Sequence, residues 1–264
     1  MILMKFTFDR YKELLSILKE DNLNILPVKD YLSERPGKNF LILRHDVDRN
    51  PQKSLKIAEI EAEFDVKSTY YFRYPHTFDT NIIQRISEMG HEIGYHYEVF
   101  SKAKGDREKA IEMFNDEIKK FQKIVDLKTA CMHGSPTSEY DNRDIWEFLD
   151  FEKYGLLGDA FFSVDDFEIY YFTDTGRRWD DKYNLRDKYE YNDVEGVEST
   201  EDLLNILKKR KIKKLYITTH PERWGKGVFD SIYLWTKDFV FNMGKKVIQF
   251  YAKYQISQKR VAKG

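Results

Sequence analysis

Cysteine is nearly absent from this sequence of 264 residues, in which Cys131 is the only one. A disulfide within the chain is therefore excluded, and a reducing compartment is allowed. No run approaches the roughly 20 apolar residues that a membrane-spanning helix needs. Lys5, Asp9 and Arg10 interrupt the apolar N-terminus, which also lacks the small-residue cleavage site of a signal peptide. We expect a cytoplasmic protein without an integral membrane segment.

The chain also lacks an excess of charge of either sign. The 44 lysines and arginines oppose 45 aspartates and glutamates, which gives a net charge of −1. A balance of this kind does not favour a nucleic-acid partner. With 41% hydrophobic residues the chain can bury a sizeable core. We expect one domain over residues 1–264, with a core at about 40–222.

Two amphipathic segments flank this core. Residues 9–21 predict an N-terminal helix, and residues 228–255 predict a long aromatic and basic C-terminal helix. We expect the C-terminal helix to pack on its own barrel. The alternatives are that it joins two subunits into a homodimer or rests on a membrane that carries lipid-linked sugars.

Between these flanks, apolar strands alternate with helical segments. Strands are predicted at 39–46, 67–75, 91–98, 128–136 and 213–221, and helices at 51–64, 80–90, 106–126 and 199–211. Residues 154–197 break the alternation and predict short strands and long loops. The alternation predicts an α/β fold in which parallel strands are joined by helical crossovers. In such folds the functional residues collect at the carboxyl ends of the strands.

Polar clusters stand where the predicted strands end. They read RHDVD at 44–48, GYHYE at 94–98, MHGSP at 132–136 and TTHPERW at 218–224. Four of the six histidines fall in or just after the last residues of a strand: His45, His96, His133 and His220. This agreement in position favours a functional site at one edge of the sheet.

The first of these clusters raises an electrostatic question. Side chains alternate along a strand, so Arg44, Asp46 and Asp48 share one face, while His45 lies on the other. Two carboxylates two residues apart repel each other unless a cation lies between them or one of them stays protonated. The alternative is that Arg44 simply neutralises Asp46.

Histidines from other strands could complete a metal site. His96 emerges where its strand ends, and Gly94 would leave room beside it for a ligand or water. His133 and His220 each end a further strand. Asp48, His96 and one more imidazole would suit zinc or a similar divalent ion with an open position for water.

Over roughly residues 40–222 the chain resembles the polysaccharide deacetylase family, carbohydrate esterase family 4, as a divergent branch. RHDVD is similar to the first motif of that family, GHEIGYH to the second and ITTH to the fifth. The resemblance implies a distorted (β/α)-barrel of about seven parallel strands. It also implies a hydrolase that removes acetyl groups from N- or O-acetylated sugars in surface polysaccharide biosynthesis. The expected cofactor is zinc, with cobalt, nickel and manganese as alternatives.

The same motifs imply roles for individual residues. Asp46 would be the catalytic base, Asp48 and His96 metal ligands, and His220 the general acid. The second motif of the family has another metal histidine where this chain has Phe100. We expect His133 to replace it; Glu98, water or a weakened site are the alternatives.

HGSP occupies the place of the third motif, and DTGRRW corresponds to the fourth. The expected substrate-binding residues are Arg44, Arg73, Ser135, Asp174, Arg178 and Trp179. Among the aromatic residues of 161–179, Trp179 is the one expected to stack on a sugar ring.

Three other hypotheses remain open. Phe100 motivates a carbohydrate-binding protein that has lost its metal and its activity. An apolar strand followed by Asp-x-Asp is also how phosphatases with an aspartate nucleophile begin, although Arg49 stands where that family has Thr or Val. Related barrels open cyclic amides of substrates other than sugars.

Overall fold

The computed structural model describes residues 6–20, 23–135, 138–165, 168–179 and 196–227. The C-terminal helix expected at 228–255, and with it the expected homodimer contact, lies outside the described residues. The same holds for 180–195, within the segment expected to form short strands and loops.

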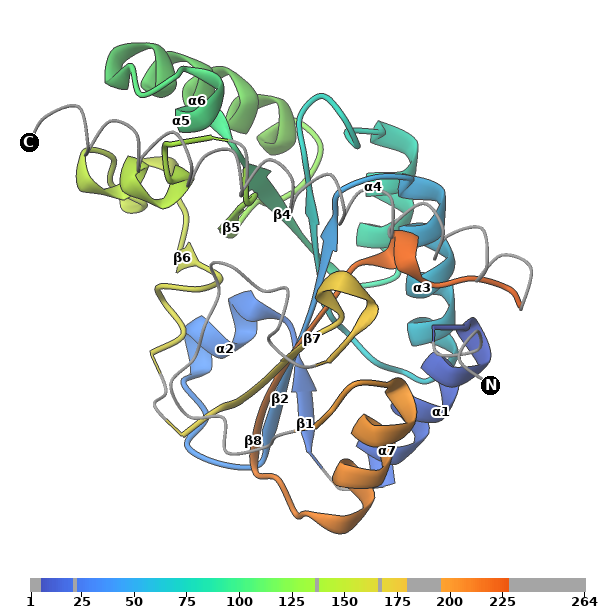
Figure 1. The fold of residues 1–264 in the computed structure, drawn as a ribbon. Helices are drawn as coiled ribbons and strands as arrows, with labels where there is room; N and C mark the ends of the chain where they lie inside the picture. Colours follow the sequence, from blue (N-terminus) through green and yellow to red (C-terminus); the bar gives the residue numbers. More distant parts are fainter. Residues whose placement is uncertain (1–5, 21–22, 136–137, 166–167, 180–195, 228–264) are drawn as a thin grey trace, which may run out of the picture.

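All strand pairings of the described sheet are parallel. The order is β6-β5-β4-β3-β2-β8-β7, and β1 pairs with β2 beside this path. The seven strands of the path curl into a half-barrel (Figure 1). The predicted α/β fold, a distorted barrel of about seven parallel strands, is therefore confirmed. The strands are β1 Asn24–Leu26, β2 Phe40–Val47, β3 Thr69–Phe72, β4 Glu92–Tyr97, β5 Thr129–Met132, β6 Gly158–Asp159, β7 Tyr170–Thr173 and β8 Lys214–Thr219.

Helices connect these strands. They are α1 Phe8–Glu20, α2 Val28–Glu34, α3 Pro51–Glu63, α4 Thr80–Glu88, α5 Val99–Lys102, α6 Arg107–Gln122 and α7 Thr200–Lys209, with short 3-10 turns η2 Asn142–Glu147, η3 Glu152–Tyr154, η4 Thr175–Arg177 and η6 Pro221–Arg223. Side-chain caps fix several helix starts: Asp79 accepts from the first turn of α4, Asp106 from that of α6, and Ser199 forms a capping box with Asp202. The sequence analysis did not predict β1, α2 or α5.

Alternation along β2 builds two apolar layers. Leu41, Leu43 and Val47 belong to the large core between the sheet and the outer helices. Phe40 and Ile42 belong to a second core inside the curl of the sheet. The inner face therefore changes from apolar to charged toward the carboxyl end of β2, where Arg44 and Asp46 follow on the same face.

Helix α2 closes the inner core at the amino ends of the strands. The backbone N–H of Val28 donates to Thr69 Oγ1 at 2.8 Å, and that of Lys29 donates to Glu92 Oε2 at 2.9 Å. Thr69 and Glu92 are the first residues of β3 and β4.

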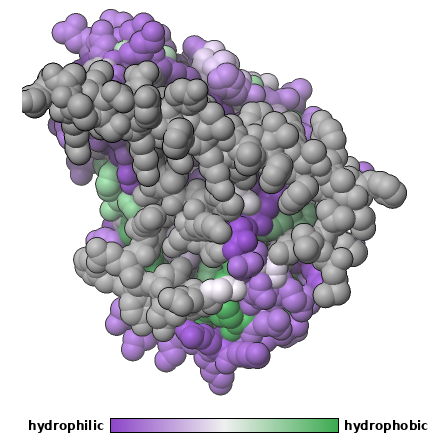
Figure 2. Space-filling model, in the orientation of Figure 1, coloured by the Kyte–Doolittle hydropathy of each residue, from purple (hydrophilic) through white to green (hydrophobic). Residues whose placement is uncertain are grey.

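In the view of Figure 2, hydrophilic residues cover the outer helices at the top and bottom, and small apolar areas lie between them.

Candidate metal centre

The predicted site residues follow strands that end at one edge of the sheet. In the parallel sheet β5 pairs with β4, β4 with β3, β3 with β2, and β2 with β8. The carboxyl ends of neighbouring parallel strands meet at the same edge. This edge carries Asp46 and Asp48 from β2, His96 and Glu98 from β4, His133 from β5 and His220 from β8.

Asp48 lies between two imidazoles. Its Oδ1 is 3.4 Å from Nε2 of His96 and 3.4 Å from Nε2 of His133. Bonds of 2.0–2.1 Å in a tetrahedral zinc site place neighbouring ligand atoms about 3.3 Å apart. Asp48 Oδ1 is buried and has no hydrogen-bond partner in the described structure. The structure therefore brings Asp48 Oδ1 within 3.4 Å of both histidines that were expected to be metal ligands with it.

The other ring nitrogen of each histidine is engaged. His96 Nδ1 is 3.1 Å from the carbonyl oxygen of Cys131, and His133 Nδ1 is 3.0 Å from Glu98 Oε2. Because a carbonyl and a carboxylate only accept hydrogen bonds, this network assigns the proton of each neutral ring to Nδ1. Each Nε2 then presents a lone pair toward Asp48. Such partners at the outer nitrogen are typical of metal-ligating histidines.

The pKa shifts of Asp48 and His133 are also consistent with a metal site. Burial by itself would raise the pKa of Asp48, but His133 and His96 hold it well below its usual value. Burial lowers the pKa of His133 against the opposing effect of Asp48 and Glu98. The cluster therefore favours an ionised Asp48 carboxylate and a neutral His133 imidazole, which is the protonation state that metal binding requires of these two groups.

A second group of ligand-type atoms lies beside the first. One ligand atom from each of Asp46, His96 and Cys131 lies within 4.8 Å of the others, and all three residues are buried. This Asp-His-Cys group could hold a metal ion. However, Arg44 donates to both oxygens of Asp46, from Nε to Oδ1 and from Nη2 to Oδ2, at 2.7 Å each. Asp48 Oδ1, by contrast, has no hydrogen-bond partner among the described residues.

Glu98 holds His133 in place and is itself fixed by cations. Arg73 Nη2 donates to both Glu98 oxygens at 2.9 Å, and Lys102 Nζ lies 3.2 Å from Oε1. Burial by itself would raise the pKa of Glu98, but His133 and the two cations keep this pKa well below its usual value. Arg73 also donates to the backbone oxygen of Asp48 at 3.2 Å. Arg73, expected to bind substrate, thus joins the ends of β2 and β4.

His220 is paired with Asp174 at the end of β8. His220 Nδ1 is 2.7 Å from Asp174 Oδ1, which also accepts from Arg223 Nη1 at 2.8 Å. Trp224 Nε1 donates to Asp174 Oδ2 at 3.0 Å. Although burial and Arg223 oppose it, Asp174 raises the pKa of His220. Asp174 is completely buried, so the expectation that it contacts substrate is corrected: it positions His220.

A further substrate contact expected from the sequence does not fit the structure. Trp179 is only 1% exposed, stacks on Phe6 at 5.8 Å and donates from Nε1 to Thr200 Oγ1 at 3.2 Å. A ring buried in the core cannot stack on a sugar. Arg178 is partly exposed and forms an ion pair with Glu198 at 2.8 Å, and its contact with substrate stays a prediction.

The remaining predicted substrate residues differ from each other. Arg44 is 1% exposed and is bound to Asp46, so it acts on that carboxylate rather than on a substrate. Ser135 is partly buried, and its Oγ lies 3.0 Å from Ser101 Oγ. Of the six, Ser135 alone keeps both partial exposure and a position two residues beyond a candidate ligand, His133.

The space beside His96 is filled rather than open. A Cβ at Gly94 would collide with the ring of Tyr71. Glycine is therefore required there by a close approach of a neighbouring strand, and the expected room for a ligand or water lies elsewhere. His45, on the other face of β2, is buried between Glu61 Oε1 at 2.8 Å and Thr219 Oγ1 at 2.6 Å.

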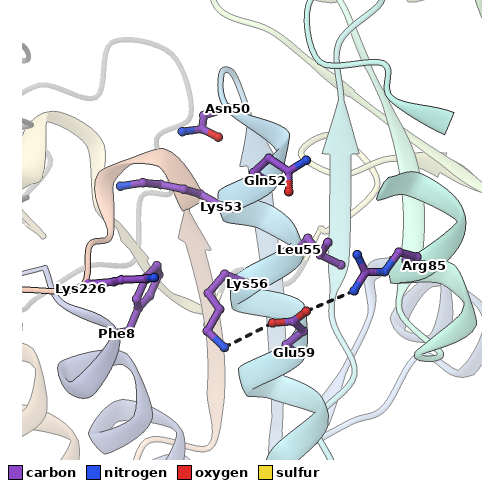
Figure 3. A pocket seen from close by; sticks show the side chains of 9 residues that line it. All are labelled: Phe8, Asn50, Gln52, Lys53, Leu55, Lys56, Glu59, Arg85 and Lys226. Atoms are coloured by element: carbon purple, nitrogen blue, oxygen red, sulfur yellow. Dashed lines mark hydrogen bonds and ion pairs between the residues drawn. The ribbon is translucent and has the colours of Figure 1, made fainter. Parts of the chain in front are cut away.

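A separate surface groove of about 380 Å³ runs along the outer side of α3 (Figure 3). It is lined by Phe8, Asn50, Gln52, Lys53, Leu55, Lys56, Glu59, Arg85 and Lys226. Glu59 pairs with Lys56 at 3.2 Å and with Arg85 at 3.3 Å. The groove contains none of the strand-end imidazoles, and it is distinct from the candidate metal centre.

Comparison with known proteins adds no name to this site. The sequence matches no protein-family model and no curated protein. Within the part of the chain that the structure describes, no helix has the length and apolar character needed to cross a membrane. The chemistry of the site must therefore be argued from its geometry.

Proposed function

We propose that the protein is a metal-dependent hydrolase that removes an acetyl group from an N-acetylated or O-acetylated sugar. The observation that carries the proposal is Asp48 Oδ1, which is buried, has no hydrogen-bond partner among the described residues, and lies 3.4 Å from Nε2 of both His96 and His133. The resemblance of RHDVD, GHEIGYH and ITTH to the deacetylase motifs supplies the reaction class. As part of the same proposal, the reaction takes place in the cytoplasm and serves surface polysaccharide synthesis.

One carboxylate and two imidazoles fit zinc, and cobalt, nickel or manganese are the alternatives. Asp48, His96 and His133 would hold the ion. When bound, a divalent ion lowers the pKa of a water molecule to about 7 and polarises the acetyl carbonyl. Glu98 and the Cys131 carbonyl would keep the two imidazoles oriented, because each accepts a hydrogen bond from an Nδ1–H.

Proton transfer falls to residues beside the ligands. The resemblance assigns the role of base to Asp46, whose pKa Arg44 lowers against the opposing effect of burial. His220 is suited to the role of acid, because Asp174 accepts at Nδ1 and favours the protonated ring. The transferable proton then lies on Nε2, from which His220 would protonate the departing sugar nitrogen or oxygen.

The rival hypotheses gain less support. Phe100 motivated a binding protein without metal, but the 3.4 Å approach of His133 Nε2 to Asp48 Oδ1 supports His133 as the replacement ligand. A phosphatase would need Asp46 as nucleophile, and Arg44 donates to both of its oxygens.

Metal content and turnover together test the proposal. The purified protein should contain about one divalent metal ion per chain by elemental analysis, and it should release acetate from N-acetylated chito-oligosaccharides. His220→Ala should keep the metal and lower turnover by about 100-fold or more. A protein that stays metal-free when zinc is supplied, or a His220→Ala variant with full turnover, would contradict the proposal.

A further inference from the structure

Phe162 is a large apolar side chain that is half exposed, at 50%. Among the described residues, Leu157 is the only other large apolar side chain with comparable exposure, at 48%. Single exposed apolar side chains are common on protein surfaces, so their positions decide what they indicate. Leu157 directly precedes β6 and lies at the amino end of that strand. Phe162 comes shortly after the carboxyl end of β6, which pairs with β5, the strand that leads to His133 (Figure 1).

The buried carboxylate of Asp159 fixes the turn that carries Phe162. Its Oδ1 accepts hydrogen bonds from the backbone N–H of Phe161 at 2.8 Å and from that of Phe162 at 3.2 Å. Its Oδ2 accepts from the hydroxyl of Tyr97 at 2.9 Å, and Tyr97 directly follows His96 on β4. The ring of Phe162 is therefore presented from a turn that is already ordered, which lowers the entropic cost of binding a ligand there.

Arg143 of η2 brings two aromatic rings together. Its Cζ lies 5.4 Å from the ring centroid of Phe161 and 5.7 Å from that of Phe162. The two rings meet edge to face, with centroids 5.7 Å apart. The same guanidinium donates to Asp141 from Nε at 3.2 Å and from Nη2 at 2.8 Å, and both side chains stay partly exposed. Phe161, Phe162, Arg143 and Asp141 form what we call the aromatic platform.

Hydrogen bonds connect this platform to the segment that carries the candidate ligand His133. Asn142, the first residue of η2, donates from Nδ2 to the backbone oxygen of His133 at 2.8 Å. Its Oδ1 accepts from the backbone N–H of Ser101 at 2.8 Å. Arg143 is the next residue along η2, and Ser135 Oγ lies 3.5 Å from Asn142 Nδ2. The aromatic platform therefore lies beside the His133 side of the candidate metal centre, with Ser135 in the same group of contacts.

We infer that the aromatic platform binds a second sugar unit of a carbohydrate chain whose acetylated unit lies at the metal centre. This inference rests on the proposed function and names its substrate class, which is an oligosaccharide or polysaccharide rather than a single sugar. The C–H groups on one face of a sugar ring pack on the electron-rich face of an aromatic ring. The sugar hydroxyls can accept from Arg143 and donate to Asp141.

The size of the exposed apolar surface also favours a sugar as the occupant. It is supplied mainly by the one half-exposed ring of Phe162, whereas stable protein interfaces bury about 800 Å² on each partner. A planar guanidinium and a carboxylate directly beside the ring would have to lose water against an acyl chain, but they find hydrogen-bond partners in a sugar.

Binding to the metal-free protein tests the platform without turnover. Calorimetric titration of the chelator-treated protein should give a Kd at least 10-fold lower for the N-acetylated chito-oligosaccharide of four sugars than for N-acetylglucosamine. Phe162→Ala should raise the Kd for the four-sugar chain by about 10-fold, the upper range for one aromatic contact. Phe162→Tyr, which keeps the ring, should retain the affinity. Leu157→Ala is the matched control, because it removes an equally exposed apolar side chain at the opposite end of β6, and it should leave the Kd unchanged.

Acetate release from the zinc-loaded protein separates this inference from the proposed function. Phe162→Ala should lower kcat/KM for the four-sugar chain by about 10-fold. An unchanged Kd for that chain in Phe162→Ala, or a four-sugar chain bound no more tightly than the single sugar, would overturn the role of the platform and leave the proposed function intact. A zinc-loaded protein that releases no acetate would contradict the proposed function, and the titrations of the metal-free protein would still decide whether the platform binds a sugar chain.

Discussion

The substitution Asp48→Asn should affect the stability of the metal-free and the zinc-bound protein in opposite directions. It should not destabilise the metal-free protein, but it should remove the stabilisation that zinc provides. Asp48 Oδ1 is buried, lacks a hydrogen-bond partner within the described parts of the chain, and lies 3.4 Å from two imidazole nitrogens. An asparagine of the same shape can turn an N–H toward His96 Nε2 or His133 Nε2. The substitution replaces an unpaired acceptor by a hydrogen bond, and it removes a charge at the same time.

The magnitudes follow from these contacts. A hydrogen bond of this kind contributes about 1 kcal/mol, which corresponds to about 2–4 °C in Tm for a chain of this size. At pH 8, where burial favours the neutral form of His133, the metal-free variant should therefore be at least as stable as the unchanged protein. Zinc at 100 times its Kd should stabilise the unchanged protein by about 2.7 kcal/mol, or roughly 5–11 °C, and should leave Asp48→Asn almost unshifted.

Thermal unfolding with and without zinc, after treatment with a chelator, measures both effects in one experiment. Asp126→Asn is the matched control, because the Asp126 side chain is 80% exposed and forms a surface ion pair with Lys128 at 2.8 Å. This variant should keep the full zinc shift. A zinc shift of normal size in Asp48→Asn would refute the assignment of Asp48 as a ligand. A metal-free variant several kcal/mol less stable than the unchanged protein would show that Asp48 is held by contacts other than a metal.

Two further predictions concern the carboxylates around the sheet. Glu98→Gln, which weakens the acceptor at His133 Nδ1, should raise the Kd for zinc by roughly 10- to 100-fold in a calorimetric titration, and an unchanged Kd would argue against the orienting role. The second prediction concerns Glu61. Burial by itself would raise the pKa of Glu61, but His45 and the hydrogen bonds to the carboxylate lower this pKa from 4.5 to about 2. Because the pKa is lower in the folded state, this stabilisation, about 3 kcal/mol, is complete above about pH 4.5 and is lost as the pH falls toward 2. Urea unfolding at pH 6 and pH 3 should show a smaller loss of stability for Glu61→Gln than for the unchanged protein, and equal losses would contradict the network.

Strand periodicity predicted which side chains meet at the carboxyl edge of the sheet, because periodicity depends on local rules. Alternation along β2 placed Arg44, Asp46 and Asp48 on one face, and parallel pairing brought His96 and His133 to the same edge. Neither step requires knowledge of how the surface is covered. The contacts of Asp48 with both imidazoles are the consequence of these two rules.

Burial outside the regular strands could not be predicted in the same way. Trp179 follows two arginines, a context typical of a surface loop, but Phe6 from the distant N-terminus covers its ring. Gly94 was expected to leave a space, and the side chain of Tyr71 from the neighbouring strand fills it. Both errors arise from contacts between segments far apart in the chain, which composition and periodicity do not encode.

If His133 is a ligand, as the proposed function holds, its position illustrates how a parallel sheet relocates a metal ligand. His96 of β4 stands beside Cys131 of β5 in the register, so the residue two positions later on β5 emerges next to the end of β4. Neighbouring strands lie only about 4.8 Å apart. Because of this short distance, a ligand that is missing after one strand can be supplied by the segment that follows the next strand. Phe100 is then free to pack against Tyr140 at 5.7 Å and Phe148 at 5.6 Å. The exchange requires an acceptor for the new imidazole, and Glu98, which ends the same β4 segment, lies 3.0 Å from its Nδ1. We therefore expect Phe100→His alone to leave zinc affinity unchanged, since the apolar packing of α5 would hold the new ring away from Asp48.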